Sequence, residues 1–434
     1  MVKLSDLNKE ERYAFRMHLS FAILEGIMLG VLALNEFVFL RSLNGSHFNM
    51  GLLFQFKMIV FLFLIFLNEF LKRIKNRRKF LRWVGIFTRL PALILLFFPH
   101  SELATSGTSM YHFIFLAVFL VYFMGAPVVK PTINLFLKAN YRHANFGRLY
   151  GYATSANKVT MLVVTFFYGF LLDIDKYAYT YILPAAALLN ILAIFLLSRI
   201  PYTPKKPLAP SVSFLKGVRR SALRMFNIVR YNKPYRHFEF SFMLYGFAFM
   251  MTVTVIYIYF EHELQMNYST MAFYRNAYNI LAIAFLPFFG KLLGNVDPRR
   301  FALITYSSVL LFLISMALSQ VFNNYVTVWG VQIYFVLLLY ILFRGMFAGS
   351  MPLLWNIGSA YFCESDDADI YQSVHLSLTG LRSLAAPLMG VYFYQEYGLN
   401  FTVSVSVALL LAAMLLLIYS YKKSHDLTYY KNII

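Results

Sequence analysis

Four polar residues with helical spacing are the clearest sign of chemistry in this sequence. Their positions differ by 3, 4 and 3, and they are Gln372, His375, Thr379 and Arg382. This spacing predicts one helical face, and because the surrounding segment is apolar, that face should line a cavity. The guanidinium of Arg382 suits a phosphate or carboxylate held by two hydrogen bonds, and His375 suits proton transfer. The alternative for Arg382 is pairing with the backbone.

Other ionisable residues also lie inside apolar segments, and most of them are basic. The basic residues are Lys57, Arg89, Lys130, Lys158, Arg344 and Arg382. The acids well inside such segments are Glu25 and Glu36. A surplus of positive charge in a low-dielectric environment repels itself unless an anion or bound water compensates it. We therefore expect an anionic organic ligand, phosphorylated or amphipathic. Arg89 is the exception, since it lies close enough to a helix end for its side chain to reach water.

Local sequence favours a binding role for several of these cations. Arg344 precedes Gly345-x-x-x-Gly349, a spacing that allows close helix packing. Lys130 lies between two prolines, where a broken helix would expose carbonyl groups, with a gating kink as the alternative. Lys158 offers a point-charge contact from a third segment. The predicted ligand residues are Lys130, Lys158, Arg344, Thr379 and Arg382.

Two carboxylates suggest coupling to protons. Glu25 and Glu36 are eleven residues apart, which is three turns of a continuous helix, so they should project from nearly the same face. A line of carboxylates inside an apolar helix suits proton uptake and release. We assign proton coupling to Glu25, Glu36 and His375. The alternative is that the carboxylates neutralise buried cations, and both roles are compatible.

About twelve long apolar segments must position these residues. Hydrophobic residues make up 60% of the 434 residues and charged residues only 13%, which excludes a soluble globular domain. Each segment has roughly 20 to 28 residues, enough to cross a bilayer as a helix. Their predicted ranges are 14–41, 48–71, 81–99, 110–137, 147–172, 178–200, 236–262, 268–292, 300–322, 325–354, 370–396 and 399–421. The sequence therefore predicts an all-α polytopic membrane protein with twelve transmembrane helices.

The positions of the basic residues predict a topology. If the N-terminus is cytoplasmic, 30 of the 39 Lys and Arg residues lie in cytoplasmic segments and helix ends, and the outer side holds Arg41, Lys176 and Arg275. The positive-inside rule then predicts cytoplasmic N- and C-termini in the inner or plasma membrane. The same distribution explains the net charge of +20 without nucleic acid as a partner.

A polar interval divides the chain into an N-terminal bundle, 1–200, a basic linker, 201–235, and a C-terminal bundle with a short tail, 236–434. The linker begins with four prolines at a spacing of three, which suits an extended strut. It continues with 211–231, whose apolar stripe and arginines fit a helix lying on anionic lipid. A solvated linker is the alternative.

Nothing in the sequence predicts catalysis. The run Glu364-Ser-Asp366-Asp367 resembles a magnesium-binding motif, but no second such cluster follows at a matching helix end. A solvated loop, or a partner for basic loops, is the better interpretation. The single cysteine, Cys363, excludes an intrachain disulfide and a thiolate metal site. Since no metal or nucleotide motif occurs elsewhere, we expect no cofactor and no enzyme activity.

The two bundles also repeat each other, because Arg77-Arg78 and Arg299-Arg300 are 222 residues apart. The second copy is Gly290-Lys-Leu-Leu-Gly294-Asn-Val-Asp297-Pro-Arg299-Arg300, and it resembles the loop motif of the major facilitator superfamily. With the twelve segments, the resemblance covers nearly the whole chain. The usual aspartate of the motif is replaced by Lys72 and Gly294, and Asp297 or Glu69 could substitute for it. The implied cytoplasmic gate residues are Arg77, Arg78, Gly290, Asp297, Arg299 and Arg300.

The resemblance implies two pseudo-symmetric six-helix bundles that rock around a midplane site in a monomer. It implies that Arg344 faces a central cavity and that Lys158 and Arg382 hold one ligand from opposite sides. We therefore expect a secondary transporter, symporter or antiporter, for a small organic anion. One alternative is a proton-driven exporter of hydrophobic drugs or lipids, in which the cations pair with acids. Another is a membrane receptor or scaffold that transports nothing.

Overall fold

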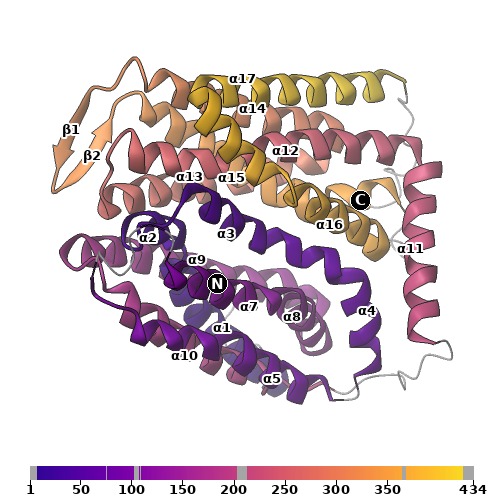
Figure 1. The fold of residues 1–434 in the computed structure, drawn as a ribbon. Coiled ribbons are helices and arrows are strands. Elements are labelled where there is room, and N and C mark those ends of the chain that lie inside the picture. Colours follow the sequence, from indigo (N-terminus) through magenta and orange to yellow (C-terminus); the bar gives the residue numbers. More distant parts are fainter. Residues whose placement is uncertain are drawn as a thin grey trace. The chain divides into compact units, whose positions relative to one another are not determined.

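The protein folds into two compact helical units (Figure 1). The computed structural model describes residues 7–74, 76–101, 107, 109–202, 213–363 and 368–423. Unit 1 contains Met1–Asn49 and Phe66–Phe214, and unit 2 contains Met50–Ile65 and Leu215–Ile434. Each unit has its own buried apolar residues and is described separately.

Unit 1 is a bundle centred on α1 (Lys9–Leu32), which packs against α9 (His143–Ile174) and α10 (Tyr179–Leu197). Its other elements are α2 (Asn35–Arg41), α4 (Leu64–Arg73), α5 (Arg77–Arg89), the 3-10 helix η3 (Leu90–Phe97), α7 (Met110–Met124) and α8 (Ala126–Asn140). Phe15 of α1, Phe136 of α8 and Ile194 of α10 belong to one buried core.

The first predicted membrane segment, 14–41, is not one continuous helix. α1 ends at Leu32 and α2 begins at Asn35, because Leu34 leaves the helical region with φ −105° and ψ 6°. The premise that one helix aligns Glu25 with Glu36 was therefore wrong. Glu25 is half-buried in α1, whereas Glu36 is completely buried in α2.

Unit 2 is organised around α12 (Lys233–His262), which packs along α17 (Ala386–Lys423). Its other helices are α3 (His47–Ile59), η2 (Val60–Phe63), α11 (Phe214–Tyr231), α13 (Tyr268–Asn295), α14 (Pro298–Leu318), α15 (Leu337–Ile357), η4 (Gly358–Phe362) and α16 (Ala368–Ser383). The close approach of α15 to α13 depends on Gly345 and Gly349, where an added Cβ would press on α13.

A β-hairpin replaces the first part of the predicted segment 325–354. β1 (Tyr325–Val328) pairs antiparallel with β2 (Val331–Tyr334), and Val328 lies opposite Val331. The two turn residues, Trp329 and Gly330, have positive φ values of 50° and 79°, as in the turns that match the twist of paired strands. Because β-branched and aromatic residues dominate both strands, this stretch favours a hairpin, and the helix begins only at Leu337.

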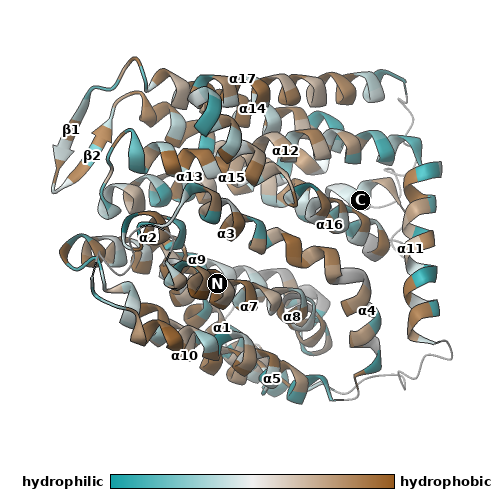
Figure 2. Ribbon diagram, viewed as in Figure 1, coloured by the Kyte–Doolittle hydropathy of each residue, from teal (hydrophilic) through white to brown (hydrophobic). Residues whose placement is uncertain are grey.

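Ten helical segments of the described chain are long and apolar enough to cross a membrane. One of them, Ile370–Lys423, has 54 residues and contains the last two predicted segments. Gly398 separates those two with a non-helical backbone at φ 79° and ψ −179°. The second predicted segment is the shorter apolar helix His47–Phe63. The predicted polytopic helical fold is thus confirmed, and apolar residues dominate its bundle helices (Figure 2).

Replacing Gly398 with alanine should lower the melting temperature. A residue with a Cβ is strained at this backbone conformation by about 1 to 3 kcal/mol. The measurement is thermal unfolding of the purified protein, with Gly151→Ala as the control. An added Cβ at Gly151 meets no atom within 4 Å, so alanine there should keep or raise stability. Equal losses in both variants would contradict the special role of Gly398.

Candidate functional site

A buried hydrogen-bonded pair, His375 and Glu239, joins α16 to α12 on the predicted polar face. Nδ1 of His375 lies 3.0 Å from Oε1 of Glu239, and both side chains are almost fully buried. The sequence analysis missed Glu239 because this residue lies near the start of a predicted segment, beside the basic linker. The statement that Glu25 and Glu36 are the acids inside the segments was therefore incomplete.

Arg382 lies two turns beyond His375 on α16 and is also held by α12. Its Nη1 donates a hydrogen bond to the carbonyl oxygen of Phe242 at 2.5 Å, and its guanidinium lies 5.2 Å from that ring's centroid. Gly246 permits this approach, because a Cβ at this position would overlap the guanidinium. Pairing with the backbone, the alternative raised for Arg382, is thus present.

Arg344 on α15 is surrounded by aromatic rings. Its guanidinium lies 4.7 Å from the ring centroid of Phe312, 5.1 Å from that of Phe249 and 5.5 Å from those of Tyr278 and Phe347. The residue is only 8% exposed, and its Nη1 has no hydrogen-bond partner in the described part of the chain. Cation–π attraction offsets part of the desolvation, but a donor such as Nη1 still needs an acceptor oxygen.

A small cavity beside Arg344 concentrates hydrogen-bond donors. Its polar lining consists of Tyr257, Tyr274, Arg275, Tyr278, Tyr340 and Arg344, and no described acidic residue lines it. In this conformation it has room for about one water molecule. Nη1 of Arg275 donates to Oη of Tyr257 at 2.5 Å, and Lys57 on α3 is within electrostatic range of Arg275. The sequence analysis counted Arg275 with the outer charges, whereas it lies two turns inside α13.

α12 connects the two arginines of unit 2. Phe242, which contacts Arg382, and Phe249, which contacts Arg344, are two helical turns apart on this helix. Tyr245 lies between them and is within electrostatic range of both guanidiniums. The structure thus brings together two of the predicted ligand residues and the predicted His375.

In unit 1, a buried arginine is linked to an acid through an asparagine. Nε of Arg89 donates to Oδ1 of Asn190 at 2.9 Å, and Nδ2 of Asn190 donates to the carboxylate of Glu25. The guanidinium also lies 4.8 Å from the ring centroid of Tyr122, in space left by Gly125. The expectation that Arg89 reaches water was wrong, since it is 3% exposed. Glu25 matches the alternative in which a carboxylate neutralises a buried cation.

The other predicted ligand residues lie elsewhere. Lys158 is half-buried on α9 of unit 1. Lys130 lies on α8, just after a helix break at Gly125, and its side chain is outside the described residues. Thr379 donates to the carbonyl oxygen of His375 on its own helix at 3.0 Å. The predicted polar face of α16 therefore packs against neighbouring helices, and it does not line the cavity beside Arg344.

The second predicted gate loop forms local contacts within unit 2. Asp297 caps α14 and pairs with Arg299 at 2.7 Å. The buried guanidinium of Arg299 also donates to the carbonyl oxygen of Ser420 on α17 at 3.0 Å. Arg300 lies 4.8 Å from the ring centroid of Tyr421. Arg299, which Asp297 holds, therefore fixes this loop to the end of α17.

The first predicted gate loop also ends at a capped helix, but its acidic residue pairs with an arginine of the preceding helix. Arg77 and Arg78 begin α5, which Asn76 caps, and Glu69 pairs with Arg73 on α4 at 3.1 Å. Gly290 lies exposed on α13. The acidic residues Glu364, Asp366 and Asp367 and the proline-rich stretch 203–212 lie outside the described residues.

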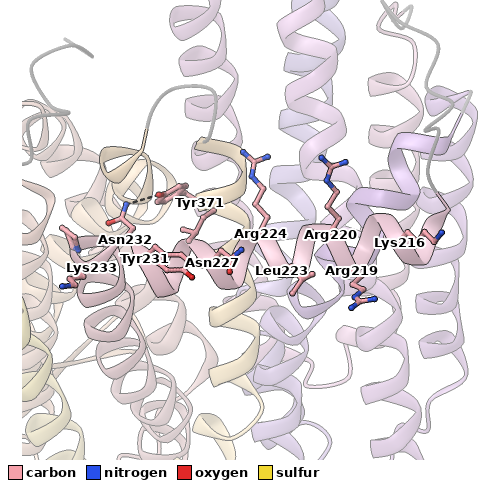
Figure 3. A pocket seen from close by; sticks show the side chains of 12 residues that line it. Lys216, Arg219, Arg220, Leu223, Arg224, Asn227, Tyr231, Asn232, Lys233 and Tyr371 are labelled. Atoms are coloured by element: carbon pink, nitrogen blue, oxygen red, sulfur yellow. Dashed lines mark hydrogen bonds between the residues drawn. The ribbon is translucent and has the colours of Figure 1, made fainter.

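A basic groove lies where α11 meets α12 (Figure 3). α11 crosses the end of α12 instead of continuing it (Figure 1), and Asn232 between them donates to Oη of Tyr371 at 3.0 Å. Arg220 and Arg224 project from one side of α11, and Arg219 projects from the other. No acidic residue occurs in α11, so this helix is both amphipathic and strongly basic.

Comparison with known proteins supports the architecture. The family model of the Major Facilitator Superfamily matches residues 18–365. The nucleoside transporter NupG shares 14% identity over 95% of this chain and 100% of its own, with a TM-score of 0.65. A D-xylose-proton symporter shares 13% identity over 94% and 96%, with a TM-score of 0.62. The human organic anion transporter MFSD10 shares 14% identity over 94% and 100%, with a TM-score of 0.60. Such low identities show the fold alone. No curated protein matches by sequence.

Replacing Gly246 with alanine should destabilise unit 2. The new Cβ would overlap the guanidinium of Arg382, and such overpacking costs about 1 to 3 kcal/mol. Thermal unfolding measures the loss. In an Arg382→Met background the same substitution should cost much less, since the obstructing group is gone. An undiminished cost in that background would contradict the contact.

Proposed function

This chain belongs to the major facilitator superfamily, and we propose that it is a secondary transporter that carries a small organic anion across the membrane by alternating access. The chain is a multi-pass membrane protein with ten described helical segments long enough to span a bilayer. The similar structures include transporters of nucleosides, peptides, D-xylose and organic anions. The fold therefore does not identify the substrate, and its chemical class must be inferred from the buried polar groups.

The observation that carries the anionic proposal is the state of Arg344. Its guanidinium is buried among aromatic rings, and its Nη1 has no hydrogen-bond partner among the described residues. Arg89 differs, because Asn190 links it to Glu25. An ionisable group inside a membrane segment is expensive and usually serves function. A carboxylate or phosphate oxygen would satisfy this donor with a charge-assisted hydrogen bond.

The surroundings of Arg344 also favour a particular shape of substrate. Guanidinium and phenol groups converge on the cavity and supply donors to an anionic head, while Phe260 and Met271 of the same lining offer contact to an apolar body. Since the cavity is closed in this conformation, substrate entry requires α12, α13 and α15 to separate. We propose that Thr379 and Arg382, which lie in the same unit as Arg344, join the ligand set when these helices move. Lys130 and Lys158 stay predicted ligand residues of unit 1.

Two other functions make different demands. In a proton-driven exporter of hydrophobic drugs or lipids, the cations would pair with acids, which fits Arg89 but not Arg344. A receptor or scaffold would bind a stoichiometric protein partner and move no solute. Binding of anions that depends on Arg344 therefore separates the proposed function from the exporter.

Glycerol 3-phosphate, phenyl phosphate or succinate should raise the melting temperature of the purified protein. An anion at 100 times its Kd stabilises the folded state by about 2.7 kcal/mol. Arg344→Gln should remove this response, whereas Arg344→Lys should keep part of it, because the charge remains. The measurement is a thermal shift titration with each of the three anions.

Arg89→Gln is the matched control, since it also removes a buried guanidinium. It should lower the starting melting temperature and leave the anion response intact. Stabilisation by tetraphenylphosphonium that persists in Arg344→Gln, with none by anions, would favour the exporter.

We also propose that α11 lies on anionic lipid of the cytoplasmic leaflet, with both termini cytoplasmic and the two halves divided at the linker, 201–235. Phe226 is 61% exposed and Leu215 72% exposed, and Arg220 and Arg224 lie on the opposite side of the helix, whereas Arg219 lies beside Phe226. An apolar stripe beside a basic face is the pattern of an interfacial helix.

Replacing Arg219, Arg220 and Arg224 with glutamine should remove the extra stability that anionic lipid gives. Each basic residue near an anionic surface contributes about 1 kcal/mol. Thermal unfolding in nanodiscs of phosphatidylglycerol and of phosphatidylcholine measures the difference. The control replaces Arg16, Lys138 and Arg142, which are exposed on unit 1. An equal loss in the control would contradict a specific role for α11.

A further inference from the structure

Glu239 and His375 have the geometry of a reversible proton site. Nδ1 of His375 lies 3.0 and 3.1 Å from the two carboxylate oxygens of Glu239. When Glu239 is ionised, its carboxylate only accepts hydrogen bonds, so that Nδ1 of a neutral His375 donates and Nε2 carries the lone pair. Nε2 is buried and has no hydrogen-bond partner in the described part of the chain. A proton can therefore add at Nε2 without breaking the bond to Glu239.

The pair is enclosed by aromatic and weakly acidic groups. The ring of Phe242 stands edge-on to that of His375 at 4.4 Å between centroids, and the ring of Trp355 does so at 5.0 Å. The titratable and charged groups within electrostatic range of Glu239 are Tyr235 from α12, Tyr306 from α14 and Arg382 from α16. Tyr245, Tyr371 and Cys363 are in turn within range of these groups. Glu239 is the one carboxylate in this described set.

The charges of this cluster are balanced only while His375 is neutral. Glu239 contributes one negative charge and Arg382 one positive charge. A proton on His375 leaves the cluster with one excess positive charge in a low-dielectric environment, which is unfavourable unless a negative charge approaches. The guanidiniums of Arg382 and Arg344 are both within electrostatic range of Tyr245. An anion bound at these arginines would therefore supply the missing negative charge.

We propose that the Glu239–His375 pair takes up one proton with each transported anion and releases it on the other side, which makes the protein a proton–anion symporter. This inference rests on the proposed anion transport and adds Glu239, a residue that the sequence did not single out. In the uptake step hydronium gives its proton to Nε2, so that an O–H bond breaks and an N–H bond forms. Nothing is oxidised or reduced, and release is the reverse step.

The test separates exchange from proton-driven accumulation in proteoliposomes. Radiolabelled glycerol 3-phosphate, phenyl phosphate and succinate are the probes. Exchange at equal pH and equal anion concentration needs no net proton movement. In Glu239→Gln and His375→Gln, accumulation driven by a pH gradient should fall at least about tenfold further than exchange does, relative to the wild type. Accumulation that survives in both variants would overturn the inference.

The chain offers a matched control in His262, which lies 3.9 Å from Glu263 as an exposed His–Glu pair. His262→Gln should keep both exchange and accumulation. Arg344→Gln should lose exchange itself, which distinguishes loss of the anion site from loss of coupling. If the wild type exchanges none of the probes, the proposed function fails, and this inference fails with it.

A measurement on the wild type covers the case in which a variant does not fold. Titration calorimetry with the same probes, in buffers of different ionisation enthalpy, counts the protons taken up on binding. About one proton per bound anion is expected at neutral pH. Binding without proton uptake would overturn the inference.

Discussion

The difficulty of removing charged groups from water is the constraint on which this structure depends. An isolated ion in a low-dielectric interior is so unfavourable that it must be paired, hydrogen-bonded or stacked on aromatic rings. Arg89, Arg344 and Arg382 are each at most 8% exposed, and each meets the constraint differently. Arg89 is linked to a carboxylate, Arg382 reaches a backbone carbonyl near Glu239, and Arg344 relies on aromatic faces.

These three solutions differ in how much capacity they leave for a ligand. The network of Glu25, Asn190 and Arg89 uses its donors and acceptors internally, so it has little reason to bind anything else. Arg344 keeps an unused donor, and His375 keeps an unused lone pair. Because Arg344 on α15 and His375 on α16 both contact residues of α12, an anion and a proton could be held near the same helix of unit 2. We expect substrate and proton binding at buried groups whose hydrogen-bond donors or acceptors have no partner within the described part of the protein.

Departures from regular helix make the buried pairs possible. Gly125 and Gly246 leave space that any side chain would fill, and each space holds a guanidinium. The break at Leu34 places Glu36 on a different helix from Glu25. A side chain at Gly246 would hold Arg382 too far from the carbonyl of Phe242 to hydrogen-bond with it, and one at Gly125 would displace Arg89.

The sequence by itself determined the polytopic helical fold, since the length and apolar character of a segment are local properties. It also identified Arg344, Arg382 and His375 as candidates, because a polar group stands out within an apolar run. Only the tertiary structure decided which side chains contact each other. Glu239 and Asn190 lie on different helices from their partners, and their sequence spacing does not predict these contacts. The hairpin at 325–334 was also not predicted, because its apolar residues run directly into those of the helix that follows. Local patterns determine the elements, but packing between helices decides where each charge finds its partner.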